Sequence, residues 1–297
     1  MRLAVLAGDA RERAAAIEMA RLGHTVRTFG GVGGPLESAS AVAALTDADA
    51  VVGPALGTNL AGDQLRRGAG EPPLSLREAW LDAPRRGAAW ALGSAGPWLR
   101  HQVAGRQGEV HTYADASAFA TLNAVPTAEG AISEATRLAG RTAWGSDVLV
   151  VGGGRCGLAL VQRLVALGAA VTGAGRTPSE RAAIAASGAR PVSIDQGALA
   201  LAASGCQLLF NTAPAPLIDT RVLEALPSGA VVVDLASGPG GTDFAAAASL
   251  GIPARLLPGL PGRLYPETAG RIVAEVVLDL LVGSRGGDRD GGSAGDR

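Results

Sequence analysis

Short apolar runs alternate with polar and glycine-rich segments along this chain. Runs with the length of buried strands occur at 3–7, 25–29, 50–53, 88–92, 110–112, 148–151, 169–174, 190–193, 208–211, 231–234 and 254–257. A helical pattern over residues 10–22 follows the first run, with Ile17, Ala20 and Leu22 on its apolar side. Because strands and helices alternate, the sequence predicts an α/β fold of doubly wound parallel sheets.

Two longer helices divide this pattern into two Rossmann-like domains. Residues 115–139 are largely helical by pattern, with Pro126 as a start or a kink, and a final helix is predicted from about 266 to 281. We expect the chain to cross between domains at both helices. The predicted domains are a substrate-binding domain of residues 1–122 completed by a helix at 265–282, a nucleotide-binding domain of residues 123–264, and a disordered tail at 283–297.

Charge and composition narrow the chemistry. The net charge is −1 and the isoelectric point is near 6.3, so neither nucleic acid nor an anionic membrane is expected as a partner. All 26 basic residues are arginines. Without a lysine the chain has no Schiff-base lysine, no pyridoxal-phosphate lysine and no Walker phosphate-loop lysine.

The cysteines and the apolar segments exclude further classes. Cys156 lies within a glycine loop and Cys206 precedes a predicted strand, so both are interpreted as small packed side chains, with no disulfide framework. The sequence shows no cluster of metal-ligand residues, and no metal is expected. The first apolar run is too short for a signal peptide and no uncharged apolar stretch is long enough to span a membrane, so a cytoplasmic protein is expected.

The most informative segment follows the apolar run at 148–151. Glycines at 152, 154 and 157 form the pattern Gly-x-Gly-x-x-Gly, and a helical apolar pattern begins directly after them. In a strand–turn–helix unit, such glycines allow a sharp turn, close approach of a pyrophosphate and close packing of the helix. The helix N-terminus adds amide donors and a positive dipole end. The segment therefore predicts a dinucleotide-binding site.

The residues after the next strand decide between NAD and NADP. An NAD site usually has an acidic residue there, which binds the ribose 2′-hydroxyl. This chain has Arg176 at that place, flanked by Thr177 and Ser179, and its first acid is Glu180. A guanidinium beside two hydroxyls suits a 2′-phosphate, which favours NADP. The alternative is a solvated surface arginine in a tight turn.

The run Asn211-Thr212-Ala213-Pro214 ends another strand and is predicted to line the nicotinamide ribose, with a turn as the alternative role. The predicted cofactor-binding residues are Gly152, Gly154, Arg155, Cys156, Gly157, Arg176, Thr177, Ser179, Asn211, Thr212, Ala213 and Pro214.

The first domain lacks this fingerprint, because Gly8 is followed by Asp9, Ala10 and Arg11 with no second glycine. Ligands of open parallel sheets bind beyond the carboxyl ends of the strands. That rule selects as cleft candidates Asp9 and Arg11, Gly57-Thr58-Asn59, and Gly93-Ser94.

Several segments together resemble one known family, the A subunit of dipicolinate synthase from endospore-forming bacteria. They are Gly8-Asp9-Ala10-Arg11, Val125-Pro126-Thr127-Ala128-Glu129-Gly130, the glycine loop with Arg176, Asn211-Thr212-Ala213-Pro214, the run from Asp234 to Phe244, Pro258-Gly259-Leu260-Pro261-Gly262, and Thr268-Ala269-Gly270. The glycine loop is shared by many dehydrogenases, whereas the Asp234–Phe244 run is more specific. The departures, Gly153, Cys156 and Gly238, affect nothing essential.

The resemblance implies an NADP-linked enzyme that forms pyridine-2,6-dicarboxylate from a cyclic imine of the lysine branch. It also implies that the partner is a flavoprotein-like B subunit of the same synthase, and that the enzyme works in the mother-cell cytoplasm during sporulation. The implied architecture is that of the 2-hydroxyacid dehydrogenases, with two domains and a cleft between them. Homodimers and hetero-oligomers are both compatible with the sequence, and an oligomer is expected.

The catalytic candidates are chosen for a substrate that carries two carboxylates and loses a hydride and a proton. Arg11 suits a bidentate carboxylate contact, or it is a surface helix arginine. Asp9 positions Arg11, takes a proton or simply caps a helix. Glu129 is an acid–base group or a charge that offsets a helix dipole. The hydroxyls of Thr127 and Ser94, with that of Thr58, are further carboxylate contacts.

Two other functions remain open at this point. One is an NADP-linked reductase of hydroxy or keto acids, which usually needs a His or Lys acid near the nicotinamide; the three histidines lie outside the motifs. The other is a non-catalytic nucleotide-binding partner of a flavoprotein. The sequence does not decide the tautomer and hydration state of the substrate, the general base or the need for the B subunit.

Overall fold

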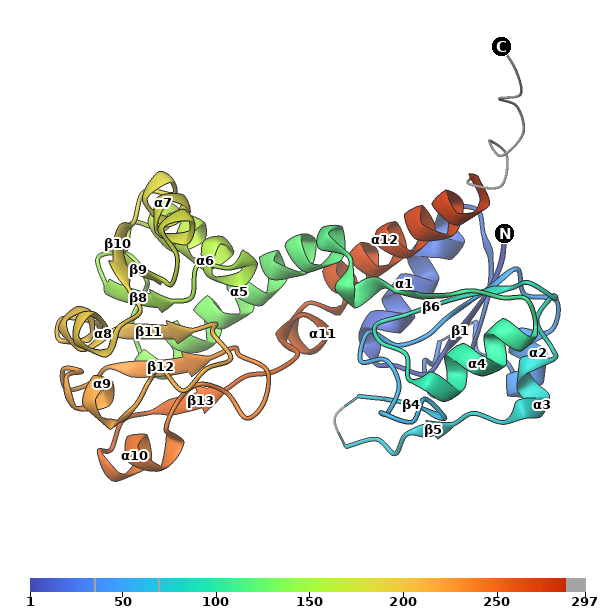
Figure 1. Cartoon of the computed structure of the whole chain (residues 1–297), viewed down its shortest axis with the longest axis horizontal. Helices are drawn as coiled ribbons and strands as arrows, with labels where there is room; N and C mark the ends of the chain where they lie inside the picture. The colour runs from blue at the N-terminus through green and yellow to red at the C-terminus, as the bar shows by residue number, and fades with distance from the viewer. Residues whose placement is uncertain (35, 69, 287–297) are drawn as a thin grey trace, which may run out of the picture. The chain divides into compact units, whose positions relative to one another are not determined.

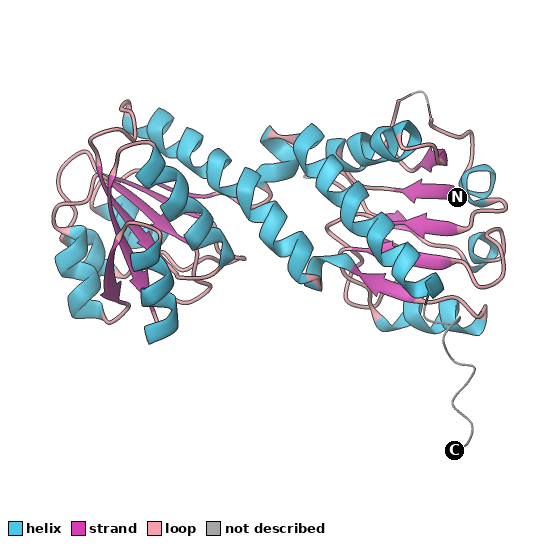
Figure 2. Ribbon diagram, turned by 90° about the horizontal axis from the view of Figure 1, so that it is seen from above, coloured by secondary structure: helices cyan, strands magenta, loops and turns pink. Residues whose placement is uncertain are grey.

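The chain forms two compact units. The computed structural model describes residues 1–34, 36–68 and 70–286. Unit 1 consists of residues 1–122 together with the chain from Pro261 onward, and unit 2 consists of residues 123–260 (Figure 1). Each unit is built on its own parallel sheet with helices on both faces (Figure 2). This is the α/β class that the alternating pattern predicts.

Unit 1 has a five-stranded parallel sheet in the order β2-β1-β3-β6-β7. Its strands are β1 (Arg2–Leu6), β2 (Thr25–Phe29), β3 (Ala50–Val52), β6 (Ala89–Leu92) and β7 (Val110–Thr112). One face is covered by α1 (Ala10–Arg21) and α12 (Pro266–Gly286), and the other by α2 (Ala41–Leu45), α3 (Glu78–Leu81) and α4 (Pro97–Gly105). The remaining elements are an antiparallel pair, β4 (Gln64–Leu65) with β5 (Leu74–Ser75), and a 3₁₀ turn, η1 (Tyr113–Asp115).

The packing of α1 differs from the predicted one. Ile17 and Leu22 are 49% and 50% exposed, so the prediction that they form the apolar side of this helix is wrong. The buried side carries Ala15, Ala16 and Met19, which face the sheet and α12. Close packing against α12, a helix from the far end of the chain, requires small residues on this side of α1. The periodicity of residues 10–22 cannot reveal that partner.

Unit 2 has a six-stranded parallel sheet in the order β10-β9-β8-β11-β12-β13. Its strands are β8 (Asp147–Val151), β9 (Ala170–Gly175), β10 (Arg190–Ser193), β11 (Leu208–Asn211), β12 (Val231–Asp234) and β13 (Ala254–Leu256). One face packs against α5 (Ser117–Ala139), α6 (Arg155–Ala166) and α7 (Pro178–Ala186), and the other against α8 (Gln196–Ala203), α9 (Thr220–Glu224) and α10 (Phe244–Ser249). A short helix, α11 (Leu260–Leu264), precedes α12.

The strand predictions agree with the observed sheets, while several helix predictions need correction. Pro126 lies inside α5 and so does not start it. The sequence predicts a disordered tail from residue 283, but α12 continues to Gly286; the rest of that expectation, residues 287–297, falls outside the described residues. Within the described part of the chain, no helix is both long and apolar enough to cross a bilayer.

Candidate functional site

The glycine loop of unit 2 has the backbone geometry that its sequence predicts. Gly152 has φ +113°, a conformation that side chains disfavour, and its N–H donates to the Ala174 carbonyl at 2.9 Å. A Cβ on Gly157 would collide with the Gly152 carbonyl oxygen. Both glycines are therefore required for β8 to turn sharply and for α6 to begin close to it.

The N-terminus of α6 is open in the way a phosphate site requires. Gly154 is the N-cap residue, and no side chain caps the helix there. A Cβ on Gly154 would meet no atom within 4 Å among the described residues. The first N–H groups of a helix have no acceptor within it, so those of Cys156 and Gly157, with the positive end of the α6 dipole, suit an anion and fit the diphosphate of a dinucleotide.

The turn from β9 to α7 carries the residues predicted to read the ribose. The Arg176 side chain is 76% exposed, Ser179 is exposed, and the Thr177 hydroxyl caps α7 by accepting the Glu180 N–H at 3.1 Å. The Glu180 carboxylate turns back and accepts the Arg176 N–H at 2.7 Å. Sequence reasoning noticed Glu180 only as the first acid after the strand.

The end of β11 is fixed by side-chain hydrogen bonds. Asn211 is fully buried, and its amide nitrogen donates to Asp234 Oδ2 at 3.0 Å. The Thr212 hydroxyl donates to the Val151 carbonyl at 3.0 Å, while Ala213 is half-buried and Pro214 is exposed. The side chains of Asn211 and Thr212 therefore hold the loop in shape, and a role for these four residues toward the ribose stays a prediction.

Asp234 organises the loop that follows β12. Its carboxylate is fully buried and accepts N–H groups of Ala236 at 2.9 Å and Gly241 at 2.8 Å, as well as the Thr242 hydroxyl at 2.7 Å. The Asp234 carboxylate thus ties the loop to the end of β12 at Ala236, Gly241 and Thr242.

In unit 1, Asp9 and Arg11 lie together at the carboxyl end of β1. Asp9 is the N-cap of α1 and accepts the Arg11 N–H at 2.8 Å, and Arg11 Nη2 lies 3.3 Å from Asp9 Oδ2. Arg11 is only 6% exposed, so it is not a surface helix arginine. Within the described residues its Nε finds no hydrogen-bond acceptor, and a Cβ on Gly262 would come within 2.7 Å of Nη2.

Two buried residues that sequence reasoning missed complete this cluster. Glu12 accepts the N–H groups of Asp9 at 2.7 Å and Ala55 at 2.9 Å, and burial raises its pKa to about 6 although Arg11 opposes the shift. The Tyr113 hydroxyl donates to the Gly53 carbonyl at 3.2 Å, and burial raises its pKa well above the usual value. The spacing Asp-x-x-Glu is a capping-box signal and could have revealed Glu12.

The other catalytic candidates are distributed over both units. In unit 1, Ser94 is exposed, and its carbonyl accepts the N–H of the buried Thr58 at 3.0 Å. In unit 2, the Thr127 hydroxyl donates to a carbonyl of its own helix at 2.7 Å, and the exposed Glu129 carboxylate lies 3.2 Å from Arg163. Asp9, Arg11 and Ser94 therefore belong to one unit and Thr127 and Glu129 to the other.

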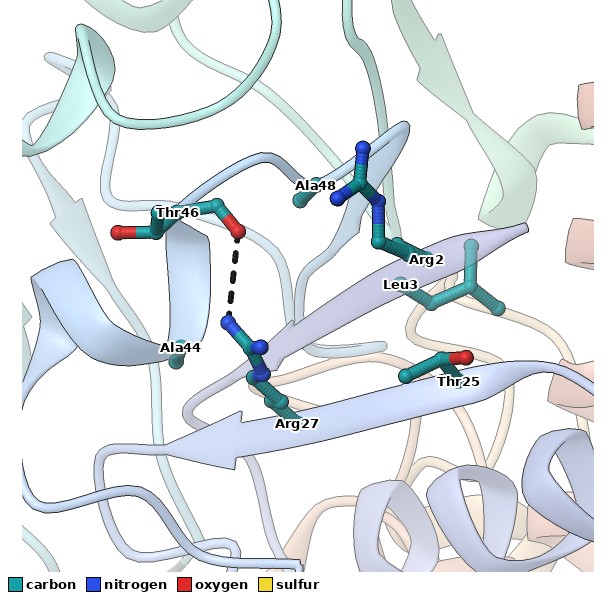
Figure 3. A pocket seen from close by; sticks show the side chains of 7 residues that line it. All are labelled: Arg2, Leu3, Thr25, Arg27, Ala44, Thr46 and Ala48. Atoms are coloured by element: carbon teal, nitrogen blue, oxygen red, sulfur yellow. Dashed lines mark hydrogen bonds between the residues drawn. The ribbon is translucent and has the colours of Figure 1, made fainter.

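Two depressions formed by described residues of unit 1 lie away from these residues. Figure 3 shows one at the amino ends of β1 and β2, where Arg27 donates to the Thr46 carbonyl at 3.4 Å; its volume of about 10 Å³ holds a single water at most. A larger one, of about 260 Å³, is lined by Arg85 and Arg106, which already form ion pairs with aspartates. Among the described residues, no group of three or more His, Cys, Asp or Glu is placed to hold a metal ion.

Comparison with known proteins places these features in a family. The A subunit of dipicolinate synthase from Bacillus subtilis is 33% identical over 163 residues, which cover 55% of this chain and 54% of that protein, so this alignment spans about half of each. The crystal structure of the dipicolinate synthase A subunit from Bacillus halodurans superposes with a TM-score of 0.80 at 30% identity, over 94% of this chain and 97% of that one. The chain belongs to the family of dipicolinate synthase A subunits.

This chain also shares its architecture with solved dehydrogenases of lower identity. Residues 119–245 match the family model described as D-isomer specific 2-hydroxyacid dehydrogenase, NAD binding domain. The D-lactate dehydrogenase of Escherichia coli has the same fold, with a TM-score of 0.57 at 16% identity over 96% of this chain and 98% of that one. This dipicolinate synthase A-like chain therefore carries an NAD(P)-binding dehydrogenase domain, which contains the glycine loop described above.

Proposed function

We propose that the protein catalyses the NADP-linked oxidation of a dihydrodipicolinate-type cyclic imine to pyridine-2,6-dicarboxylate. Membership of the family of dipicolinate synthase A subunits is the observation that carries this proposal. The open glycine loop and the exposed Arg176 support the cofactor part of it, because they supply amide donors for the diphosphate and a cation for the 2′-phosphate.

The reaction requires little acid–base chemistry from the protein. The substrate ring loses a hydride and a proton and becomes aromatic; NADP⁺ held at the glycine loop would supply the hydride acceptor, and the proton would pass to solvent. The residues of the chain have to bind two carboxylates and exclude other orientations of the ring. A strong base is unnecessary for that task.

Arg11 is proposed as the principal carboxylate-binding residue. Asp9 and Glu12 hold its guanidinium at the carboxyl end of β1, the edge where parallel sheets bind ligands. The hydroxyls of Ser94 and Thr127 are proposed as weaker contacts. Glu129, whose carboxylate is paired with Arg163, is proposed as an acid–base group.

The proposal also covers the partner subunit of the enzyme and its compartment. The relatives bear the name of one subunit of a synthase, which supports the presence of a second, different subunit. We propose that this partner is the flavoprotein-like B subunit of dipicolinate synthase, and that the two act together in an oligomer in the mother-cell cytoplasm of a spore former.

Replacement of Arg11 tests this assignment. Arg11→Ala removes the proposed carboxylate contact and is expected to reduce turnover of dihydrodipicolinate at least about a hundredfold, while the dissociation constant for NADP⁺ stays within about twofold. Thr127→Ala should reduce this turnover by less than about tenfold. Turnover and cofactor binding are measured on the same preparations.

Arg21→Ala serves as the matched control, since Arg21 is exposed on the same helix and paired with the half-buried Glu18. It should leave turnover unchanged. Unfolding midpoints separate loss of the site from loss of the fold. Full turnover by Arg11→Ala would refute the assignment, and NADP⁺ binding without any turnover in the unmodified protein would favour the non-catalytic nucleotide-binding role.

A further inference from the structure

The Glu180 carboxylate lies between the glycine loop and Arg176. A Cβ on Gly153 would lie 2.6 Å from the Glu180 Cβ and 3.2 Å from Glu180 Oε2, so this side chain extends beneath the loop. Oε2 accepts the Arg176 N–H at 2.7 Å, and Oε1 lies 4.0 Å from Arg176 Nη2. The Glu180 side chain remains 27% exposed. A negative charge therefore stands beside the one arginine proposed to read the 2′-phosphate.

This contact is more than the usual helix cap. In a capping box, a glutamate in the first turn accepts the N–H of the N-cap residue, which is Thr177 here. Glu180 instead accepts the N–H of Arg176, the residue before the N-cap. The carboxylate is thereby drawn away from the start of α7 and toward the end of β9, the position from which a Rossmann-type domain reads the ribose.

We propose that Glu180 is a specificity-determining residue that weakens discrimination between NADP and NAD. The proposal rests on the proposed function, because it concerns the cofactor site of that reaction. A 2′-phosphate carries close to two negative charges, so a carboxylate beside Arg176 repels it and also competes for the guanidinium. A 2′-hydroxyl, in contrast, can donate a hydrogen bond to the same carboxylate. Arg176 and Glu180 thus act in opposite directions, and the site accepts both nucleotides.

Neutralising Glu180 tests this inference on the full chain without substrate. Glu180→Gln keeps an oxygen to accept the Arg176 N–H but removes the charge. We expect the dissociation constant for NADP⁺ to fall about tenfold and that for NAD⁺ to rise about threefold, measured by calorimetric titration with each nucleotide. Arg176→Ala should shift the ratio of the two constants in the opposite direction.

Two further variants separate charge from shape. Glu180→Asp retains the charge, so its ratio of dissociation constants for NADP⁺ and NAD⁺ should stay near that of the unmodified protein. Glu134→Gln removes an acid that is paired with Arg137 on α5 of the same unit, at 2.6 Å, and should change neither constant. Unfolding midpoints of all variants show whether the β9–α7 turn remains folded.

The outcomes distinguish this inference from the proposal on which it rests. If both nucleotides bind and Glu180→Gln leaves the ratio of their constants unchanged, or weakens NADP⁺, Glu180 only supports the turn and the inference is wrong. If the unmodified protein binds neither nucleotide, the proposed function fails and the inference fails with it. An increase in the preference for NADP⁺, absent from Glu134→Gln, supports it.

Discussion

Arg11 and Glu12 show how neighbouring charged residues can form part of a core. Both side chains are buried at the carboxyl end of β1, where the capping box of α1 turns them inward. A buried charge is costly unless it is paired and hydrogen-bonded. Glu12 meets this condition through two backbone N–H groups and Arg11 through Asp9, so the cluster positions the arginine that is proposed to bind the substrate.

The pH dependence of stability reports on Glu12. Its pKa of about 6 lies above the ordinary value of 4.5, so the unfolded chain binds fewer protons between these two values. Its contribution to stability is therefore fully present below pH 4.5 and is lost as the pH rises through 6. Relative to Glu12→Gln, the free energy of unfolding should fall by about 2 kcal/mol between about pH 4 and pH 7.

Chemical denaturation across this pH range measures the effect. Glu18→Gln is the control, because Glu18 is a half-buried acid on the same helix whose pKa is lowered by its hydrogen bond with Arg21. The free energy of unfolding measured relative to Glu18→Gln should show no such fall between about pH 4 and pH 7. A constant difference between the unmodified protein and Glu12→Gln at every pH would contradict the assignment of a raised pKa to this residue.

The candidate site could be predicted from sequence only where a motif fixes a backbone shape. Gly152, Gly154 and Gly157 could be found in this way, because they form one motif, and at Gly152 and Gly157 only glycine meets the steric requirement. Glu12 and Tyr113 escape such reasoning because their roles arise from burial by segments distant in sequence. The Asp-x-x-Glu spacing indicates the capping box that contains Glu12, but it does not indicate burial, because a charged residue in a helix is usually exposed.

Among the elements, the pair α1 and α12 explains both the success and the limits of the fold prediction. The central strands β3, β11 and β12 are buried on both faces and appear as apolar runs, so their bounds are visible in the sequence. The buried side of α1 depends instead on α12, which follows it by more than two hundred residues. The β4–β5 pair likewise escapes prediction, because strands of two residues carry no periodicity.

Gly270 tests the close packing of these two helices. A Cβ there would lie 2.5 Å from the Ala14 Cβ and 2.6 Å from the Ala15 nitrogen. In an open helix, Gly→Ala stabilises by about 1 kcal/mol, whereas overpacking against a backbone costs about 1–3 kcal/mol. The steric cost should be the larger effect, so Gly270→Ala is expected to lower the free energy of unfolding.

Gly283→Ala provides the comparison on the same helix. Gly283 is exposed, and a Cβ there meets no described atom within 4 Å. Its replacement should be neutral or slightly stabilising. Equal effects of the two substitutions in a denaturant titration would show that α1 and α12 do not pack as closely as described.

At the scale of the whole molecule, the two units divide the proposed tasks. Unit 2 contains the open N-terminus of α6 and the Arg176–Glu180 pair, which suit a dinucleotide. Unit 1 contains the buried arginine proposed for the carboxylates and is completed by α12 from the end of the chain. The structural match to a family member covers both units, so the proposal concerns the whole chain.

The most direct measurement follows the absorbance of the purified protein with enzymatically generated dihydrodipicolinate, with and without NADP⁺ and with and without the flavoprotein-like partner. The account predicts that NADPH and the pyridine chromophore appear together in a one-to-one ratio and only when NADP⁺ is present. Omission of the partner shows whether this chain is sufficient by itself. Absence of NADPH under every combination, in a protein that binds NADP⁺, would contradict the proposed oxidation.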